Sequence, residues 1–360
     1  MPLKTLLLTA TAAVLVLAGC KKDDAPATTD FQTLKRTVLV DFSTHVALAS
    51  YKDLRDASLT LNASIQALET AQTGINLTAA QNDWKAMRGI WEQCEGFLFG
   101  PVDVNEYDPY MDTWPTDYTQ IDSLISSRTP LEVTDIEQIP LSLRGYHPLE
   151  YLLFGQGGSR QPGDFTPRQL KYMSSLTTDI SNTCTKLYGS WAGTPENYAV
   201  QVAQSGTPQS AAYPKMQNAY LDIVDGMAGI CEEVGEAKIK DPYDARDPQV
   251  VESPYSGNSW TDFENNLRGL QNVYLGHYKT HGLGLADLVA AKNKALDTKM
   301  QGQINAAISS FATVKAMPFE QSILSAAERS KIQRIMDALA TLKTTLEDEL
   351  RPFVLQYITD

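Results

Sequence analysis

A histidine and a glutamate lie three residues apart in segment 144–155, which has the sequence RGYHPLEYLLFG. Because proline is favoured at the first position of a helix, Pro148 predicts a helix start, with His147 as the cap and Glu150 at the third helical position. The imidazole and the carboxylate would then share one turn, where they could supply a nitrogen and an oxygen to a metal ion. Gly145 would let another group approach the backbone closely here.

The same pair also has a purely structural explanation. Glu150 could reach back to the free backbone amide of His147, as in a capping box, while the imidazole only packs against its neighbours. For an isolated His-x-x-Glu pattern both explanations stand, and the choice between them needs a second observation from elsewhere in the chain.

A weak internal repeat supplies that observation. Residues 84–100 and 260–276 both begin with tryptophan and end with glycine, 176 positions apart, and their apolar positions match. Both helices are expected to end at a glycine C-cap, and the offset suggests duplication of a helical bundle. Moved forward by that offset, the histidine and the glutamate fall on Ile323 and Ala326. A polar pair present in one copy only argues for a site rather than a requirement of the fold.

Other catalytic patterns are weaker. The sequence lacks His-Glu-x-x-His, which gives a metallopeptidase two imidazoles and a general base on one helical face. The nearest spacing joins His277 and His281, but no glutamate follows the first of them, and Gly276 with Gly282 indicates a loop. The sequence also lacks the Gly-x-Ser-x-Gly elbow of serine hydrolases, and Cys94 lies in a helical apolar stripe, where a buried inert thiol is usual.

The elements that must position these residues are helices. Apolar residues recur every three or four positions, most clearly in 170–191, 216–234 and 332–350, whereas period-two strand patterns and Asn-Gly or Asp-Gly hairpins are absent from the sequence. The fold class is therefore all-α, with long helices joined by short turns. Residues 241–259 are too rich in Pro, Asp and Ser for a helix and are expected to form a long loop.

The first 19 residues resemble a lipoprotein signal peptide. Lys4 precedes an almost wholly apolar run that ends at residues 17–20, LAGC, and this run is shorter than the roughly 20 residues that a membrane-spanning helix requires. We expect Cys20 to be lipidated and residues 20–34 to form a flexible tether. The lipid alone would then attach the protein to the cell envelope, at the outer membrane, facing the periplasm or the cell surface.

The rest of the chain is expected to form two helical bundles related by the duplication. It is longer than the roughly 250–300 residues that a single core serves, so we place the first bundle, with the His–Glu pair, at 35–192 and the second at 193–360. We expect the four tryptophans of these bundles that flank the motif segments to belong to the core rather than to a ligand platform. They are Trp84, Trp91, Trp114 and Trp260.

The charge of the chain narrows the class of partner that it can bind. The chain carries 43 acidic and 30 basic residues, and loss of residues 1–19 removes only Lys4 among them, which moves the formal net charge from −13 to −14. Such acidity repels phosphate backbones, so nucleic acid is not an expected partner.

Three cysteines remain after lipidation, namely Cys94, Cys184 and Cys231. An odd number permits at most one disulfide, for which Cys184 with Cys231 is our candidate.

Four segments together resemble the imelysin-like family of bacterial envelope proteins. Residues 145–155 match its Gly-x-His-x-x-Glu motif, and residues 84–101 resemble its first long conserved helix. Residues 111–118 resemble its Trp-Pro turn, and residues 262–276 its second-half helix. The resemblance covers roughly residues 35–355.

The resemblance implies a two-domain all-α fold, a site between the two halves, and a link to iron uptake. The family also carries a peptidase label. Matched residue by residue, the resemblance implies His147 and Glu150 as site and metal-binding residues, followed by Glu95 and Trp114. From the second half it implies Asp262 and Asn266.

Three functions fit these observations. The first is an envelope lipoprotein that binds iron, another divalent or trivalent cation, or a metal complex as part of iron uptake, because carboxylates suit hard cations. The second is a metal-dependent peptidase with Glu150 or Glu95 as general base. The third is a structural partner of an outer-membrane transporter. We favour binding, because a two-residue motif cannot fill the three protein ligand positions of a catalytic metal.

Overall fold

The structure is a computed structural model that describes residues 30–359. The predicted signal peptide, the predicted lipidation at Cys20 and residues 21–29 of the predicted tether lie outside the described residues. Helix α1 (Phe31–Asp41) begins before the predicted tether ends. Leu34 and Val38 are buried on one face of this helix, so residues 31–34 are helical rather than part of a flexible tether.

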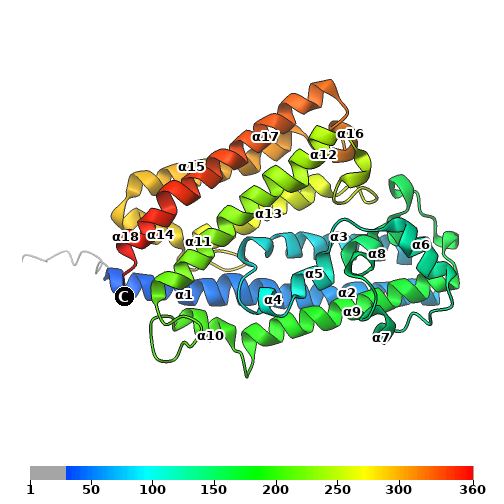
Figure 1. Ribbon diagram of the computed structural model, residues 1–360, viewed down its shortest axis with the longest axis horizontal. Coiled ribbons are helices and arrows are strands. Elements are labelled where there is room, and N and C mark those ends of the chain that lie inside the picture. The colour runs from blue at the N-terminus through cyan, green and yellow to red at the C-terminus, as the bar shows by residue number, and fades with distance from the viewer. Residues whose placement is uncertain (1–29, 360) are drawn as a thin grey trace, which may run out of the picture. The chain divides into compact units, whose positions relative to one another are not determined.

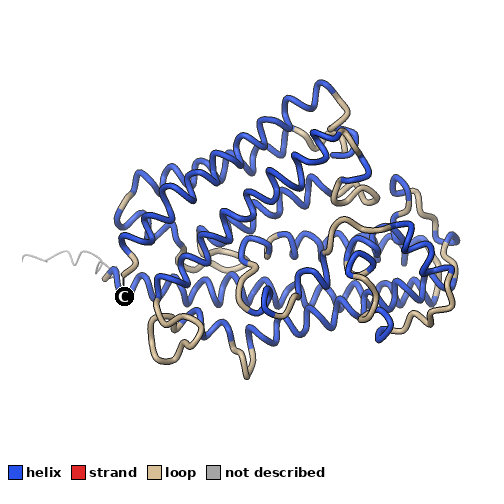
Figure 2. The backbone as a smooth tube through the Cα atoms, viewed as in Figure 1, coloured by secondary structure: helices blue, strands red, loops and turns tan. Residues whose placement is uncertain are grey.

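Helices form the regular structure of the described residues, and no strand occurs among them (Figures 1 and 2). The all-α prediction is confirmed. The isolated bridge between His277 and His281 is the one β-type pairing in this part of the chain. Residues 30–359 contain no helix that combines the length and the apolar character needed to cross a bilayer.

The first half is organised by three long helices. Helix α1 continues through the π-helical segment η1 (Phe42–Leu48) into α2 (Ala49–Thr70), which packs against α3 (Gly74–Glu92) and α9 (Pro167–Ala192) (Figure 1). Short helices lie along this layer. They are α4 (Pro101–Val104), α5 (Tyr107–Asp112), α6 (Tyr118–Ser126), α7 (Val133–Ile136), α8 (Tyr146–Phe154) and α10 (Tyr198–Ala203).

The second half is organised by four long helices. In chain order they are α11 (Met216–Glu232), α13 (Ser259–Leu275), α15 (Lys294–Ser310) and α17 (Ala326–Thr345). The shorter helices are α12 (Lys240–Ala245), α14 (Leu285–Lys292), α16 (Phe319–Ser322) and α18 (Arg351–Tyr357). Helix α11 runs on into the π-helical segment η6 (Glu233–Ile239), and α12 occupies the first part of the predicted loop 241–259, the rest of which is irregular apart from a short 3-10 turn at Pro248–Val250.

The two halves meet where α3 packs against α13 and α11 packs against the turn after α3. Gly269 lies against the carbonyl of Gln93, and Gly226 lies 2.7 Å, measured from an ideal Cβ, from the carbonyl of Gly96. Helix α3 also ends near this close approach. It stops at Glu92, whereas the sequence predicted an end at Gly100. The matching prediction for α13 is confirmed, since Gly276 ends it in the left-handed conformation with φ 70°.

One hydrophobic cluster of buried residues runs through both halves, and residues 31–359 form one compact unit. The division into two domains and the duplication of a bundle therefore stay predictions. The core prediction holds for Trp84, Trp91 and Trp260, which are buried, but Trp114 is only partly buried. The three described cysteines are free and buried, so the candidate Cys184–Cys231 disulfide is wrong.

Candidate metal centre

Helix α8 brings His147 into contact with the end of α5. The helix begins at Tyr146 with Gly145 as its N-cap, so the predicted start at Pro148 is two residues late and His147 is helical rather than a cap. Gly145 has φ 84° and its Cα lies so close to the carbonyl of Met111 that a Cβ would collide with it. The predicted close approach at Gly145 is therefore confirmed, and it places Asp112, the next residue after Met111, beside the imidazole.

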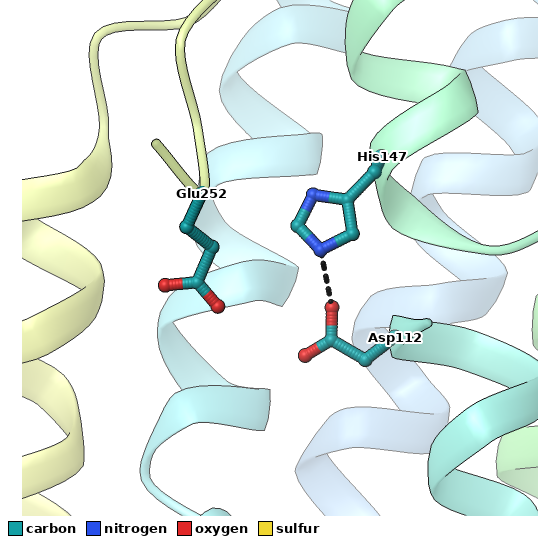
Figure 3. A group of neighbouring side chains, drawn as sticks. All are labelled: Asp112, His147 and Glu252. Atoms are coloured by element: carbon teal, nitrogen blue, oxygen red, sulfur yellow. Dashed lines mark ion pairs between the residues drawn. The ribbon is translucent and has the colours of Figure 1, made fainter. Parts of the chain in front are cut away.

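Asp112, His147 and Glu252 form a first group of candidate metal ligands (Figure 3). Their ligand atoms all lie within 4.8 Å of one another. Their side chains are 4%, 0% and 5% exposed, respectively. In Figure 3, Glu252 approaches from a loop on the opposite side from α5 and α8.

The carboxylate of Asp112 pairs with the imidazole of His147. Oδ1 of Asp112 lies 2.9 Å from Nε2 of His147. The other carboxylate oxygen, Oδ2, accepts hydrogen bonds from Arg88 and from the indole of Trp91, each at 2.6 Å. These two donors hold the carboxylate in place and leave Oδ1 facing the imidazole of His147.

Glu92, Glu95 and Asp112 form a second group with the same spacing limit of 4.8 Å. Asp112 belongs to both groups, so the two candidate positions are adjacent. Glu92 lies in the last turn of α3 and Glu95 in the 3-10 turn that follows, which the early end of α3 makes possible. Asn266 donates hydrogen bonds from its side-chain amide to Glu92 at 2.7 Å and to Glu95 at 2.5 Å.

Two buried cations face these carboxylates. Arg88 forms ion pairs with Glu92, with Asp112 at 2.6 Å and with Glu252 at 3.1 Å. Lys238, from η6, lies 2.8 Å from Glu95 and 3.0 Å from Glu252. It also lies 3.6 Å from Glu92 and 3.4 Å from the half-exposed Glu233.

Negative charge exceeds positive charge inside this cluster. The two cations face six carboxyl groups with at most 6% residue or side-chain exposure. These are Glu92, Glu95, Asp112, Glu150, Glu252 and Asp262. A buried charge needs a partner because burial removes its hydration, so a surplus of this size favours either uptake of protons or binding of a further cation.

The pKa values of these groups follow from the surplus. Burial, and then Glu92, raise the pKa of Glu95 well above its usual range, and the same two causes raise the pKa of Asp262. Burial raises the pKa of Glu150 to about 7. Burial acts on Asp112 in the same direction, but Arg88 and His147 outweigh it and hold the pKa of Asp112 well below its usual range. Without a further cation, Glu150 is therefore partly protonated near neutral pH.

A cavity of about 420 Å³ adjoins the cluster and connects it to solvent. Asp112, Glu95 and Glu252 line it together with Lys238, Trp114 and the partly buried Asp108. Burial raises the pKa of Asp108 to about 7, and Asp112 adds to this shift. An ion in the cavity would therefore meet carboxylates from both candidate groups.

The structure brings together only part of the predicted site. His147 belongs to the first group and Glu95 to the second, and the ring of Trp114 lies 5.0 Å from that of His147, centroid to centroid. Glu150 is in neither group. Its Oε1 accepts hydrogen bonds from the backbone amide of Ser256 at 2.8 Å and from its hydroxyl at 2.6 Å, so no capping box forms with the amide of His147.

The two candidates from the second half support the cluster without joining either ligand group. Asn266 binds the carboxylates of Glu92 and Glu95, as described above. Asp262 accepts hydrogen bonds from the hydroxyl of Ser253 at 2.7 Å and from the amide of Asn258 at 2.6 Å, both in the loop that carries Glu252. Asp262 therefore fixes the loop rather than facing His147.

Sequence reasoning missed five residues of the cluster. Arg88 and Glu92 are spaced i, i+4 on α3, a pattern that indicates one helical face and was available from the sequence. Asp112 lay inside the Trp-Pro turn segment without a signal of its own. Glu252 and Lys238 come from an irregular loop and a π-helical segment, for which periodicity gives no orientation.

Fold and site together define an all-α protein built around a buried cluster of carboxylates with one histidine. The profile of the imelysin family matches residues 47–346, most of the chain, and the chain belongs to that family. The family resemblance is thereby confirmed.

Relatives agree with this assignment. The chain is 28% identical over 317 residues to iron-regulated protein A of Synechococcus elongatus, which covers 87% of this chain and 85% of that protein. A solved structure from Parabacteroides distasonis, assigned as an iron-regulated protein A precursor, is 27% identical and superposes with a TM-score of 0.79 over 92% of this chain and all of that chain. An imelysin-like protein from Psychrobacter arcticum shares the fold at 15% identity, with a TM-score of 0.71 over 91% and 97%.

Proposed function

We propose that this protein binds iron, or another multivalent cation or metal complex, at the buried cluster of Asp112, His147 and Glu252. The observation that carries the proposal is the convergence of buried ligand atoms at one place, where several of them have no hydrogen-bond partner. Within residues 30–359, Nδ1 of His147, Oε2 of Glu150 and Oε2 of Glu252 have none, and Oδ1 of Asp112 lies 2.9 Å from Nε2 of His147. A cation among them would satisfy these atoms and offset the surplus of negative charge.

The mixed ligand set supports iron in particular. Imidazole nitrogen suits iron, zinc, copper and nickel, whereas carboxylate oxygen suits hard cations, so one histidine with several carboxylates fits Fe²⁺ and Fe³⁺ on both counts. Two of the relatives are named for iron regulation, which supports an iron-related role for this chain. Glu92 and Glu95 would hold a second ion or the ligands of a metal complex.

A peptidase has less support from the same residues. Glu150, the predicted general base, already accepts two hydrogen bonds from Ser256, and its side chain is fully buried. Glu95, the other candidate base, is bound by Lys238 and Asn266. A general base must reach the proton that it abstracts, so these contacts favour binding without turnover.

Calorimetric titration tests the proposal. Wild type should bind Fe²⁺ under nitrogen, or Fe³⁺ supplied as its citrate complex, and Asp112→Asn and Glu252→Gln should each weaken binding by about tenfold or more. Glu236→Gln is a matched control, because it removes one acidic charge from the exposed face of η6 outside the cluster. Absence of measurable binding of iron, Mn²⁺ or Ca²⁺ to the wild type would overturn the proposal.

We further propose that the lipid on Cys20 holds the protein at the outer membrane, where metal arrives before import and an outer-membrane transporter acts as partner. Labelling of cells with radioactive palmitate should mark the wild type but not Cys20→Ser, and the wild type should fractionate with outer membranes. Labelling that persists in Cys20→Ser, or a wild type found only in the soluble fraction, would contradict this part.

A further inference from the structure

Three of the four histidines of the chain lie outside the buried cluster and meet at one turn. The turn joins α13 to α14 and begins where Gly276 ends α13 in the left-handed conformation. It closes by a hydrogen bond from the amide of Gly282 to the carbonyl of Gly276, and the isolated antiparallel bridge pairs His277 with His281. The turn therefore places these two imidazoles side by side, although helix α13 has already ended at Leu275.

The two rings present the same nitrogen to each other. Nδ1 of His277 and Nδ1 of His281 lie 3.1 Å apart, and the rings are almost perpendicular, with an interplanar angle of 85° and centroids 4.2 Å apart. Two nitrogens bound to one ion at about 2.0–2.1 Å, with an angle between about 90° and 109°, are separated by about 2.8–3.4 Å. The observed spacing therefore suits two ligands of one metal ion as well as it suits a single N–H···N hydrogen bond.

The pair is open to solvent. His281 is exposed and His277 is only partly buried, so an ion can reach both rings. The neutral imidazole is the form that binds metals.

The third histidine supports the turn and does not join the pair. His45, from η1, forms a hydrogen bond between its Nδ1 and the hydroxyl of Thr280 at 2.9 Å, and lies 3.9 Å from Asp41. Asp41 in turn accepts a hydrogen bond from the amide of Leu283 at 2.7 Å. The metal-ligand groups found among residues 30–359 include no third ligand for the pair, so water or an external ligand would complete the coordination.

We propose that His277 and His281 form a two-imidazole site for a late first-row divalent ion, Cu²⁺ before Ni²⁺ and Zn²⁺. The order follows the general affinity of nitrogen ligands for these ions. The site is separate from the carboxylate cluster, because Asn266, which binds Glu92 and Glu95, lies 11 residues before His277, about 16 Å away at 1.5 Å per residue of α13. The two sites would also select different metals, since one offers imidazoles alone and the other mainly carboxylates.

A titration with Cu²⁺, followed by electron paramagnetic resonance, tests the proposal. The full chain is purified in detergent without a histidine tag for this experiment. The wild type should show hyperfine coupling to two imidazole nitrogens. His277→Ala and His281→Gln should each weaken this binding by about tenfold or more. Loss of a residue that only hydrogen-bonds to a metal ligand already costs about that much affinity, and loss of the ligand itself should cost at least as much. Circular dichroism and the melting temperature show whether each variant is folded.

His45→Ala and His147→Ala are matched controls, because each removes an imidazole and leaves the pair intact. Both should retain the two-nitrogen signal and the Cu²⁺ affinity of the wild type. A signal that survives in the double variant of residues 277 and 281, or the lack of any two-nitrogen signal in the wild type, would overturn the proposal. Loss of the signal in His147→Ala alone would assign the copper to the buried cluster instead and would equally overturn it.

Discussion

Replacement of Lys238 by methionine tests whether the buried carboxylates form a cage for a cation. The ammonium of Lys238 lies between 2.8 and 3.6 Å from Glu95, Glu252, Glu233 and Glu92, and its side chain is only 11% exposed. Burial disfavours its charge, but Glu252 and the other three carboxylates outweigh burial and raise its pKa well above the usual range. In the absence of metal, Lys238 therefore acts as a tethered cation inside the cluster.

The expected cost of the substitution is several kcal/mol. At 3.0 Å and an effective dielectric constant of 20, the attraction between Lys238 and Glu252 alone is about 5.5 kcal/mol. Desolvation of the ammonium offsets much of this attraction, and removal of one partner from a buried ion pair costs about 3–5 kcal/mol in total. At about 2 °C per kcal/mol for a large domain, the melting temperature should fall by roughly 6–10 °C.

Calorimetry measures the melting temperature of both proteins in the presence of chelator and in the presence of Fe²⁺. Lys238→Met should melt lower than the wild type in chelator, and Fe²⁺ should raise its melting temperature more than that of the wild type, because the ion replaces the missing charge. A ligand at about 100 times its Kd stabilises a protein by about 2.7 kcal/mol. The deficit should also shrink as the pH is lowered, because protonation of the buried carboxylates reduces the negative charge that Lys238 balances.

Lys240→Met is the matched control. Lys240 is two residues away and 46% exposed, and it pairs with Glu236 and Asp244 at the surface. Such a pair contributes about 0–1 kcal/mol, so this variant should melt close to the wild type. An equally small effect of Lys238→Met would refute the charge argument, whereas a large loss of stability without extra stabilisation by iron would refute the cation site.

Three further predictions concern pH and backbone geometry. The pKa of Glu150 is raised from 4.5 to about 7, so the folded state binds the extra proton and stability should fall as pH rises from about 4.5 to 7, by about 3 kcal/mol from this group. Urea unfolding of the metal-free protein at pH 5 and pH 8 should show a smaller pH dependence in Glu150→Gln, and an unchanged one contradicts the assignment. Gly145→Ala should lose at least about 2 kcal/mol in urea unfolding, because φ is 84° and the new Cβ would collide with Met111. Gly302→Ala, in the exposed middle of α15 with open space around it, should instead gain about 0.5–1 kcal/mol, and a loss there would show that the surroundings are not open.

Local sequence patterns determined the fold class and several individual features. The three-to-four-residue periodicity reports which face of each helix is buried, and it predicted an all-α chain correctly. The glycine at 276 ends α13 as expected, and Gly145 marks a close backbone approach, because both effects depend on the residue itself. The patterns failed where packing overrides propensity: α8 begins before Pro148, and α3 ends before Gly100, where the backbone meets α11 and α13.

Only the tertiary structure decided the composition of the site. His147 was visible in a motif, but Asp112 and Glu252 reach it from a short helix and from a loop more than 100 residues later in the chain. The motif glutamate, Glu150, binds Ser256 instead of the first ligand group. Periodicity describes one element at a time, whereas the meeting of side chains from α3, α5, α8 and a distant loop depends on how those elements pack. The sequence therefore specified helices and one ligand, and packing assembled the buried surplus of carboxylates around it.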